Sequence, residues 1–224
     1  IEGEGETAGC PPLVYGEITG TDAVVNAAAG EGSGAPAAPR KTFLFYAHYD
    51  GQPVVPSQWK DDPWKPVIRA GRHESGAPIV DPARVDSGDR FDYRLYARSA
   101  ADDKAPIMAL AAALDFLKAA SIPLAVDVKF LFEGEEEGGS PHLEALVRKH
   151  RDLLRADGLF ICDGPVDQTG RMQITYGARG TIGLEITTYG PNHPLHSGHD
   201  GTWALNPVAH LANLLASMGD DDGR

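Results

Sequence analysis

Three consecutive glutamates, Glu135, Glu136 and Glu137, follow an apolar run in the segment FLFEGEEEGG. Neighbouring carboxylates repel one another, and carboxylates placed where water is excluded need a positive partner. Taken alone, the segment is equally compatible with a solvated acidic turn. It therefore predicts either such a turn or a site for a cation.

Other candidate metal ligands occupy similar places. His48 and Asp50 end the apolar run TFLFYAHYD, Asp163 ends GLFICDG, and Asp102 directly precedes a strong helix. Each has a plain alternative when taken singly: a turn with a solvated acid, a cap, or an ordinary acidic helix start. Ligands of open α/β sheets lie outside the carboxyl ends of the strands. Because imidazole and carboxylate oxygen suit zinc and similar ions, the set together predicts a metal site.

Strand-like and helix-like segments alternate through most of the chain. Strands are expected at 11–20, 42–50, 124–134 and 158–164, and helices at 105–120 and 140–150. Ser140 is expected to cap the second helix and Pro141 to occupy its first position. The runs at 42–50 and 158–164 are apolar enough for buried strands. This order predicts an α/β fold with a mainly parallel mixed sheet flanked by helices, with a loop at 21–40 and a surface excursion at 71–94.

The pattern changes after residue 179. A strand is expected at 181–190 and a helix at 206–218, with Asn206 as its cap and Pro207 at its first position. One strand and one helix cannot bury a core alone. We therefore expect a catalytic domain over 1–179 and the start of a smaller α/β domain over 180–224, both parts of a longer protein.

Composition excludes several classes of function. The formal net charge of −12 over 224 residues argues against a nucleic-acid binder, which needs basic residues to neutralise phosphates. The only cysteines, Cys10 and Cys162, cannot form a thiolate metal cluster. No apolar stretch approaches the roughly 20 residues that span a bilayer, so no membrane partner is expected. No export signal is visible, so a cytoplasmic location is expected.

The motifs AHYDGQPV, YARSAADDKAP, FLFEGEEEGGS, ICDG and LHSGHDG occur in an order that resembles the two-metal aminoacyl hydrolases. That family includes carboxypeptidase G, acetylornithine deacetylase, succinyl-diaminopimelate desuccinylase and the carnosinase-type dipeptidases. DDKAP, EGEEEGGS and TYGARG are most similar to the carnosinase-type branch. The resemblance extends from about residue 12 to residue 220. It implies a zinc-exopeptidase-like catalytic domain and a smaller lid domain that forms a homodimer.

The resemblance also implies a ligand set for two divalent ions. Zinc is expected, with manganese or cobalt as alternatives. His48 and Asp163 would bind one ion, Asp102 would bridge both, and Glu137 would bind the second. The peptide bond between Asp102 and Asp103 would be cis, as is usual in the family.

Catalytic roles follow from the same resemblance. Glu136 would be the general base for a water shared by the two ions, and it would later protonate the leaving amine. Asp50 would lie behind His48 and orient its ring. His196, in LHSGHDG, would polarise the scissile carbonyl from the lid. Glu135 would be incidental.

The sequence departs from the family pattern in a few places. The family has a further histidine on the second ion, contributed late in the chain, and this sequence ends before that point. His210, inside an expected helix, is a poor substitute. Ala97, Ser99 and Ala105 stand where the family usually has glycines, which restricts the local backbone angles.

The leading hypothesis is a metallopeptidase that hydrolyses the amide bond of a small peptide. An N-acyl amino acid deacylase with the same site is the alternative within enzymes. Arg179, in YGARG, is a candidate for handling a substrate carboxylate. A non-catalytic binding or scaffold relative is the alternative outside enzymes, and the presence of Glu136 argues against it because a scaffold needs no proton carrier.

Overall fold

The computed structural model describes residues 1–2, 7–21, 39–85, 92–164, 167 and 169–220. The chain forms two compact units, Ile1–Val166 and Asp167–Arg224, and each is described by itself. No helix among the described residues is both long and apolar enough to cross a lipid bilayer.

A four-stranded sheet forms the centre of the first unit. Its strands are β1 (Val14–Ile18), β2 (Thr42–His48), β6 (Asp127–Glu133) and β7 (Gly158–Ile161), in the order β1-β6-β2-β7. β2 is parallel to both β6 and β7, whereas β1 is antiparallel to β6. The predicted α/β fold with a mixed, mainly parallel sheet is confirmed. Parallel pairing also brings the carboxyl ends of β2, β6 and β7 to one edge.

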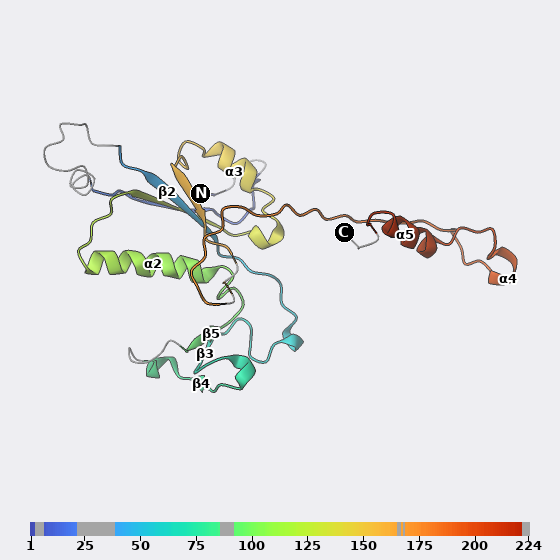
Figure 1. The fold of residues 1–224 in the computed structure, drawn as a ribbon, viewed down its shortest axis with the longest axis horizontal. Helices are drawn as coiled ribbons and strands as arrows, with labels where there is room; N and C mark the ends of the chain where they lie inside the picture. Colours follow the sequence, from blue (N-terminus) through green and yellow to red (C-terminus); the bar gives the residue numbers. More distant parts are fainter. Residues whose placement is uncertain (3–6, 22–38, 86–91, 165–166, 168, 221–224) are drawn as a thin grey trace. The chain divides into compact units, whose positions relative to one another are not determined.

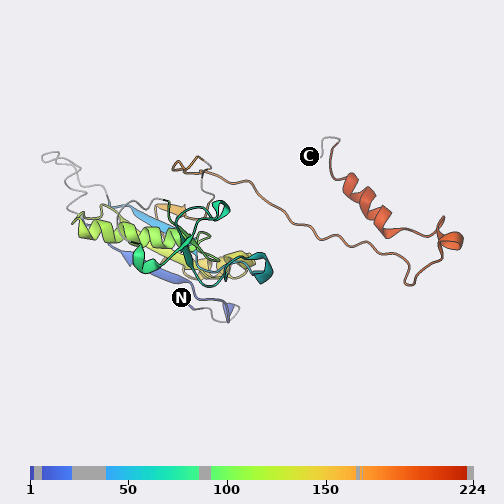
Figure 2. The same cartoon turned by 90° about the horizontal axis from the view of Figure 1, so that it is seen from below.

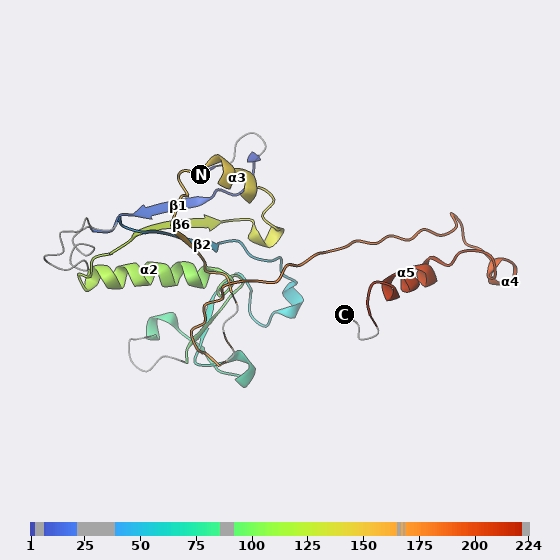
Figure 3. The same cartoon turned by 45° about the horizontal axis from the view of Figure 1, so that its top comes forward.

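Within the described residues two helices flank this sheet, α2 (Lys104–Ala119) and α3 (Leu143–Lys149). Figures 1 and 3 show the sheet between them, and Figure 2 shows α2 running along it. Alternate positions of β2 and β6 send leucines toward α3, where burial of apolar surface stabilises the unit. The core cluster consists of Leu13, Leu44, Leu131, Leu146 and Leu154.

The start of α3 differs from the prediction. Ser140 does not cap a helix, because it lies in the left-handed region at φ 52° and α3 begins only at Leu143. The intervening residues close a turn in which the Leu143 N–H donates to the Ser140 carbonyl at 3.2 Å. The predicted helix at 140–150 is thus shorter, and its predicted serine cap was wrong.

β7 is more exposed than its sequence indicates. Leu159, Phe160 and Ile161 keep 57%, 43% and 64% of their surface accessible. Among the described residues, β7 pairs only with β2, so it forms an edge of the sheet. An apolar run predicts a strand that can be buried, but the neighbouring elements decide whether it is.

The segment 71–94 contains structure that was not predicted. β4 (Ile79–Val80) and β5 (Arg94–Tyr96) pair antiparallel with β3 (Val67–Arg69) in a separate three-stranded sheet. The buried Arg69 guanidinium pairs with Asp61 and donates to the Ala77 carbonyl at 2.9 Å. Among its described residues, two short 3-10 helices lie in this segment, η3 (His73–Ser75) and η4 (Pro82–Arg84). Two more lie outside it, η2 (Pro56–Gln58) and η5 (Glu136–Gly138). Residues 86–91, and 22–38 of the expected loop at 21–40, lie outside the described residues.

The described residues of the second unit form two helices, α4 (Ser197–Asp200) and α5 (Pro207–Ala216). The Asn206 side chain accepts from the N–H groups of Val208 and Ala209 at 3.0 and 3.3 Å, which confirms the predicted cap. The predicted strand at 181–190 is not formed, and the described residues of this unit contain no strand. A strand needs a neighbour to satisfy its backbone groups, and none is described beside this segment.

Candidate metal centre

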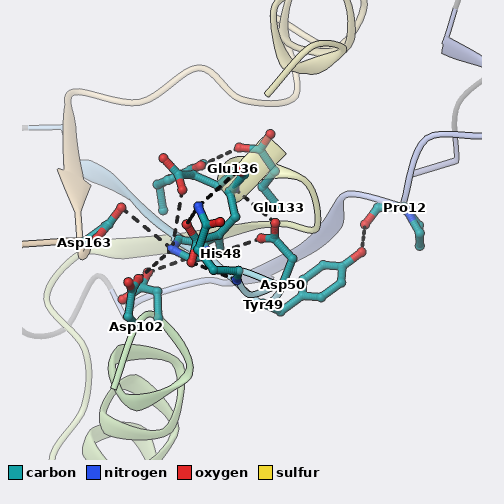
Figure 4. A network of polar contacts seen from close by, with 12 residues as sticks. Pro12, His48, Tyr49, Asp50, Asp102, Glu133, Glu136 and Asp163 are labelled. Atoms are coloured by element: carbon teal, nitrogen blue, oxygen red, sulfur yellow. Dashed lines mark hydrogen bonds and ion pairs between the residues drawn. The ribbon is translucent and has the colours of Figure 1, made fainter. Parts of the chain in front are cut away.

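His48, the last residue of β2, is the centre of the candidate site. Its side chain is fully buried, and its ring meets carboxylates from three other segments (Figure 4). Nε2 lies 3.1 Å from Oδ1 of Asp102, which precedes α2. It also lies 3.8 Å from Oε2 of Glu136, after β6, and 3.8 Å from Oδ2 of Asp163, after β7. The carboxyl ends of the three parallel strands and the start of α2 thus supply one cluster.

Asp50 contacts the opposite side of the His48 ring. Its Oδ1 lies 3.1 Å from His48 Nδ1. Its Oδ2 accepts a hydrogen bond from the Glu137 N–H at 3.1 Å. One carboxylate therefore ties the end of β2 to the acidic turn after β6, and it leaves Nε2 of the histidine facing the other acids.

Asp102 and Asp103 differ sharply in their surroundings. The Asp102 side chain is 67% exposed, whereas Asp103 is 2% exposed and accepts from the His48 N–H through Oδ2 at 3.1 Å. Burial raises the pKa of Asp103 to about 6. The peptide bond between the two residues is cis, as the resemblance implies. The DDK sequence is a helix start as well as a site element, because Asp103 stands at the N-cap position of α2.

The three neighbouring glutamates point to three separate partners, so their carboxylates are kept apart. Glu136 faces the His48 ring. Glu137 accepts two hydrogen bonds from Gln52. The backbone N–H of Gln52 donates to Oε1 at 3.2 Å, and its side-chain Nε2 donates to Oε2 at 2.7 Å. Glu135 accepts from the His142 N–H at 3.0 Å, and both its carboxylate oxygens lie 3.0 Å from His142 Nδ1. These contacts join Glu135 to a residue outside the cluster around His48, and the expectation that Glu135 is incidental to the chemistry stays a prediction.

The acids and the histidine shift one another's protonation. Burial raises the pKa of Glu136, and Asp163, Glu137 and Asp50 raise it further against the opposing effect of His48. Burial lowers the pKa of His48, but the carboxylates around it, Glu136 foremost, make the net shift upward. A raised pKa makes a carboxylate a stronger base, which suits a group that takes up a proton and later returns it.

The donor set fits a divalent cation. Two groups of three residues have ligand atoms within 4.8 Å of one another: His48 with Glu136 and Asp163, and His48 with Asp102 and Glu137. Imidazole nitrogen and carboxylate oxygen are the ligands that zinc takes when thiolates are absent. Both groups share His48, whereas the resemblance assigns His48 to one ion only and Glu136 to neither. The ligand assignment remains a prediction.

His196 belongs to the second unit and is described with that unit alone. Its side chain is exposed, and its Nδ1 accepts from the Gly198 N–H at 3.1 Å as the N-cap of α4. Its ring centroid lies 5.0 Å from that of His199. Arg179 and His210 are also exposed in this unit. The predicted catalytic role of His196 remains a prediction.

Several contributors to the site were not identified from sequence. Gln52 carries no metal-ligand signal, yet it binds Glu137. Tyr46 donates from its hydroxyl to the buried carboxylate of Glu133, which lies beside His48 in the β2–β6 register. The period-two spacing of Tyr46 and His48 on β2 was the one available signal, because it places both on one face.

Comparison with known proteins identifies the family of this chain. Residues 44–216 match Peptidase family M20/M25/M40. The chain belongs to this family, which confirms the resemblance that its motifs carry.

Particular relatives lie in the dipeptidase branch. The chain is 30% identical over 223 residues to the Beta-Ala-His dipeptidase of Mus musculus, covering 98% of this chain and 38% of that protein. It is 31% identical over 199 residues to the Cys-Gly metallodipeptidase dug1 of Schizosaccharomyces pombe, covering 82% and 41%. The chain thus spans about two fifths of the length of the curated relatives it matches.

A solved structure supports the fold. The M20 family metallo-carboxypeptidase Sso-CP2 from Sulfolobus solfataricus matches with a TM-score of 0.56 and 29% identity. The match covers 95% of this chain and 40% of that one. The sheet and flanking helices of the first unit are therefore those of an M20 peptidase.

Proposed function

We propose that the full-length protein is a metal-dependent hydrolase that cleaves the amide bond of small peptides, with a dipeptide as substrate. The observation that carries the proposal is the cluster around Nε2 of the buried His48, where acids from two strand ends and from the start of α2 converge within 3.8 Å. Family membership supports the same reaction class.

The residues can be given roles in this proposal. His48, Asp102, Glu137 and Asp163 would hold two divalent ions, with zinc as the expected metal. Bound ions of this kind supply a water of lowered pKa and polarise a carbonyl oxygen. In this proposal the Nδ1–H group of His48 donates a hydrogen bond to Asp50, which leaves Nε2 as the atom that faces an ion.

Glu136 is the proton carrier in the proposal. Its carboxylate lies at the cluster, and its raised pKa makes it able to take a proton from water and return it to the leaving amine. His196 is proposed to stabilise negative charge on the scissile carbonyl oxygen. Homodimer formation through the second unit and a cytoplasmic location also stay predictions, as does the division into a catalytic domain (1–179) and a lid (180–224).

The substrate class comes from the named relatives. Their names specify β-Ala-His and Cys-Gly as substrates of those proteins. We propose dipeptides of this size for the present protein. An N-acyl amino acid is the competing substrate, because the same site would cleave its amide bond.

The test is hydrolysis by the full-length protein of β-Ala-His, Cys-Gly and N-acetylated amino acids, before and after chelation of metal. We expect dipeptide cleavage that is lost on chelation and restored by zinc or manganese. Glu136→Gln should lower kcat by about 10²- to 10⁴-fold while the protein still binds metal. Glu144→Gln, an exposed change on α3, is the control and should keep full activity. Cleavage of N-acetyl amino acids alone would favour the deacylase. Absence of any hydrolysis would contradict the enzyme.

A further inference from the structure

The first glutamate of the triplet closes the turn that carries the other two. The Glu135 carbonyl accepts from the N–H groups of Gly138 and Ser140 at 3.1 and 3.0 Å. Gly139 and Ser140 occupy the left-handed region at φ 86° and 52°, so the chain reverses sharply there. The backbone of Glu135 therefore holds both the middle and the far end of the turn.

The side chain of Glu135 binds the next element. Its Oε1 accepts from the His142 N–H at 3.0 Å, and its two oxygens lie 3.0 Å from His142 Nδ1. The Glu135 side chain is 15% exposed and that of His142 is 34% exposed. A mostly buried carboxylate that makes these contacts is held in one place, since leaving it unpaired would cost free energy.

His142 is itself fixed by the core. It stands at the N-cap position of α3, and the Leu146 N–H donates to its carbonyl at 3.1 Å. Leu146 is 1% exposed and belongs to the leucine cluster of the sheet. The contact between Glu135 and His142 thus links the acidic turn to a packed helix.

Glu136 and Glu137 leave this turn toward His48 and Gln52. We propose that Glu135 and His142 form a positioning pair, which holds the turn so that Glu136 and Glu137 meet the metal centre. The inference rests on the proposed function, because it assigns the pair to the same site. It gives Glu135 a role other than binding metal or moving protons.

The experiment uses the full-length protein with Glu135→Ala, Glu135→Gln and His142→Ala. Glu144→Ala is the matched control, because Glu144 lies on the same helix, is 77% exposed and pairs only with Arg148 among the described residues. Zinc affinity of the metal-free protein is measured by calorimetry, kcat and KM are measured with a dipeptide, and circular dichroism gives the folded fraction. The Gln variant keeps a carbonyl acceptor for the His142 N–H.

We expect Glu135→Ala to weaken zinc binding, lower kcat, or both, by about 10- to 100-fold per folded molecule. KM should change much less, the Gln variant should recover most of the loss, and Glu144→Ala should match the parent. Parent zinc affinity and parent kcat in folded Glu135→Ala would overturn the proposal. If that variant does not fold, His142→Ala decides by the same criteria.

The outcomes also separate this inference from the proposed function. Weakened zinc binding in Glu135→Ala, with a parent that hydrolyses no peptide, supports the positioning pair and rejects the hydrolase. A parent that hydrolyses dipeptides, with zinc affinity and kcat unchanged in Glu135→Ala and His142→Ala, supports the hydrolase and rejects the positioning pair. A parent that binds no divalent ion rejects both.

Discussion

Nδ1 of His48 lies 3.1 Å from Oδ1 of Asp50, and the other oxygen of that carboxylate accepts from the Glu137 N–H at 3.1 Å. Asp50 therefore orients one predicted ligand through its ring and another through its backbone. An asparagine has only one acceptor oxygen, so it cannot accept from both groups, and an amide that donates to Nδ1 would leave the ring proton on Nε2. We expect Asp50→Asn to weaken zinc binding by about 10- to 100-fold. Calorimetric titration of the metal-free full-length protein measures this, and an unchanged affinity would remove Asp50 from the site.

A second prediction concerns the Gly51–Ser99 contact beside the site. A Cβ on Gly51 would overlap the hydroxyl of Ser99, which is 4% exposed and held at φ 62°. Gly51→Ala should lower the free energy of unfolding by about 1–3 kcal/mol through overpacking. Ser99→Gly should change it by less than about 1 kcal/mol, because relief of the left-handed serine offsets the added freedom of the unfolded chain.

The double variant Gly51→Ala/Ser99→Gly tests the cause of that loss. We expect it to recover most of the stability, because the overlapping hydroxyl is gone and neighbouring substitutions are not additive. Urea denaturation of all three variants measures the effect. Additive losses would show that Ser99 is not the obstacle.

A third prediction concerns the anchor of α3. Leu146 is 1% exposed, and truncating it leaves a cavity in the leucine core. Leu146→Ala should lower the free energy of unfolding by about 2–5 kcal/mol. Val147→Ala on the same helix removes a side chain that is 36% exposed, and it should cost much less. Equal losses by thermal denaturation would mean that α3 does not pack on the sheet as described.

A fourth prediction concerns acid stability at the end of the sheet away from His48. Asp127 accepts from the Gly20 N–H at 2.9 Å and from Arg40 Nε at 2.7 Å, and these two contacts lower its pKa. A carboxylate whose pKa is lower in the folded than in the unfolded protein stabilises the fold. This stabilisation is fully present at pH values above the unfolded-state pKa of roughly 3.9, and it is lost as the pH falls through the pKa of the folded state. Asp127→Asn should therefore lower Tm at pH 7 and reduce the difference between Tm at pH 7 and at pH 3.

The control for that measurement is Asp115→Asn, which changes an exposed carboxylate on α2. Its Tm should follow the parent over the whole pH range. A parent-like pH dependence in Asp127→Asn would show that the pair with Arg40 does not contribute to acid stability.

Much of the first unit could be predicted because the signals are local. Apolar runs marked β2 and β6, and the acids that follow them fell at one edge because the strands are parallel. The Asn206 cap of α5 was predictable for the same reason, since a cap and its partners lie within three residues.

The remaining features depend on partners elsewhere in the chain. Ser140 has the chemistry of a helix cap, but Glu135 accepts its N–H and places it in the left-handed region. The run at 181–190 has a strand-like pattern, but no neighbouring strand is described to pair with it. Gln52 could not be recognised as a partner of Glu137 until β2 and β6 were aligned. Local pattern predicts what a segment can form, and its neighbours decide what it forms.

We propose that the carboxylates around His48 hold two divalent ions. The most direct measurement is the metal content of the full-length protein and of Asp102→Ala after dialysis, by elemental analysis. Asp102 suits this test because its side chain is 67% exposed, so its removal should leave the fold intact. We predict close to two ions per chain in the parent and a clear loss in the variant. A parent that retains no divalent ion, or a variant that holds as many as the parent, would contradict the account.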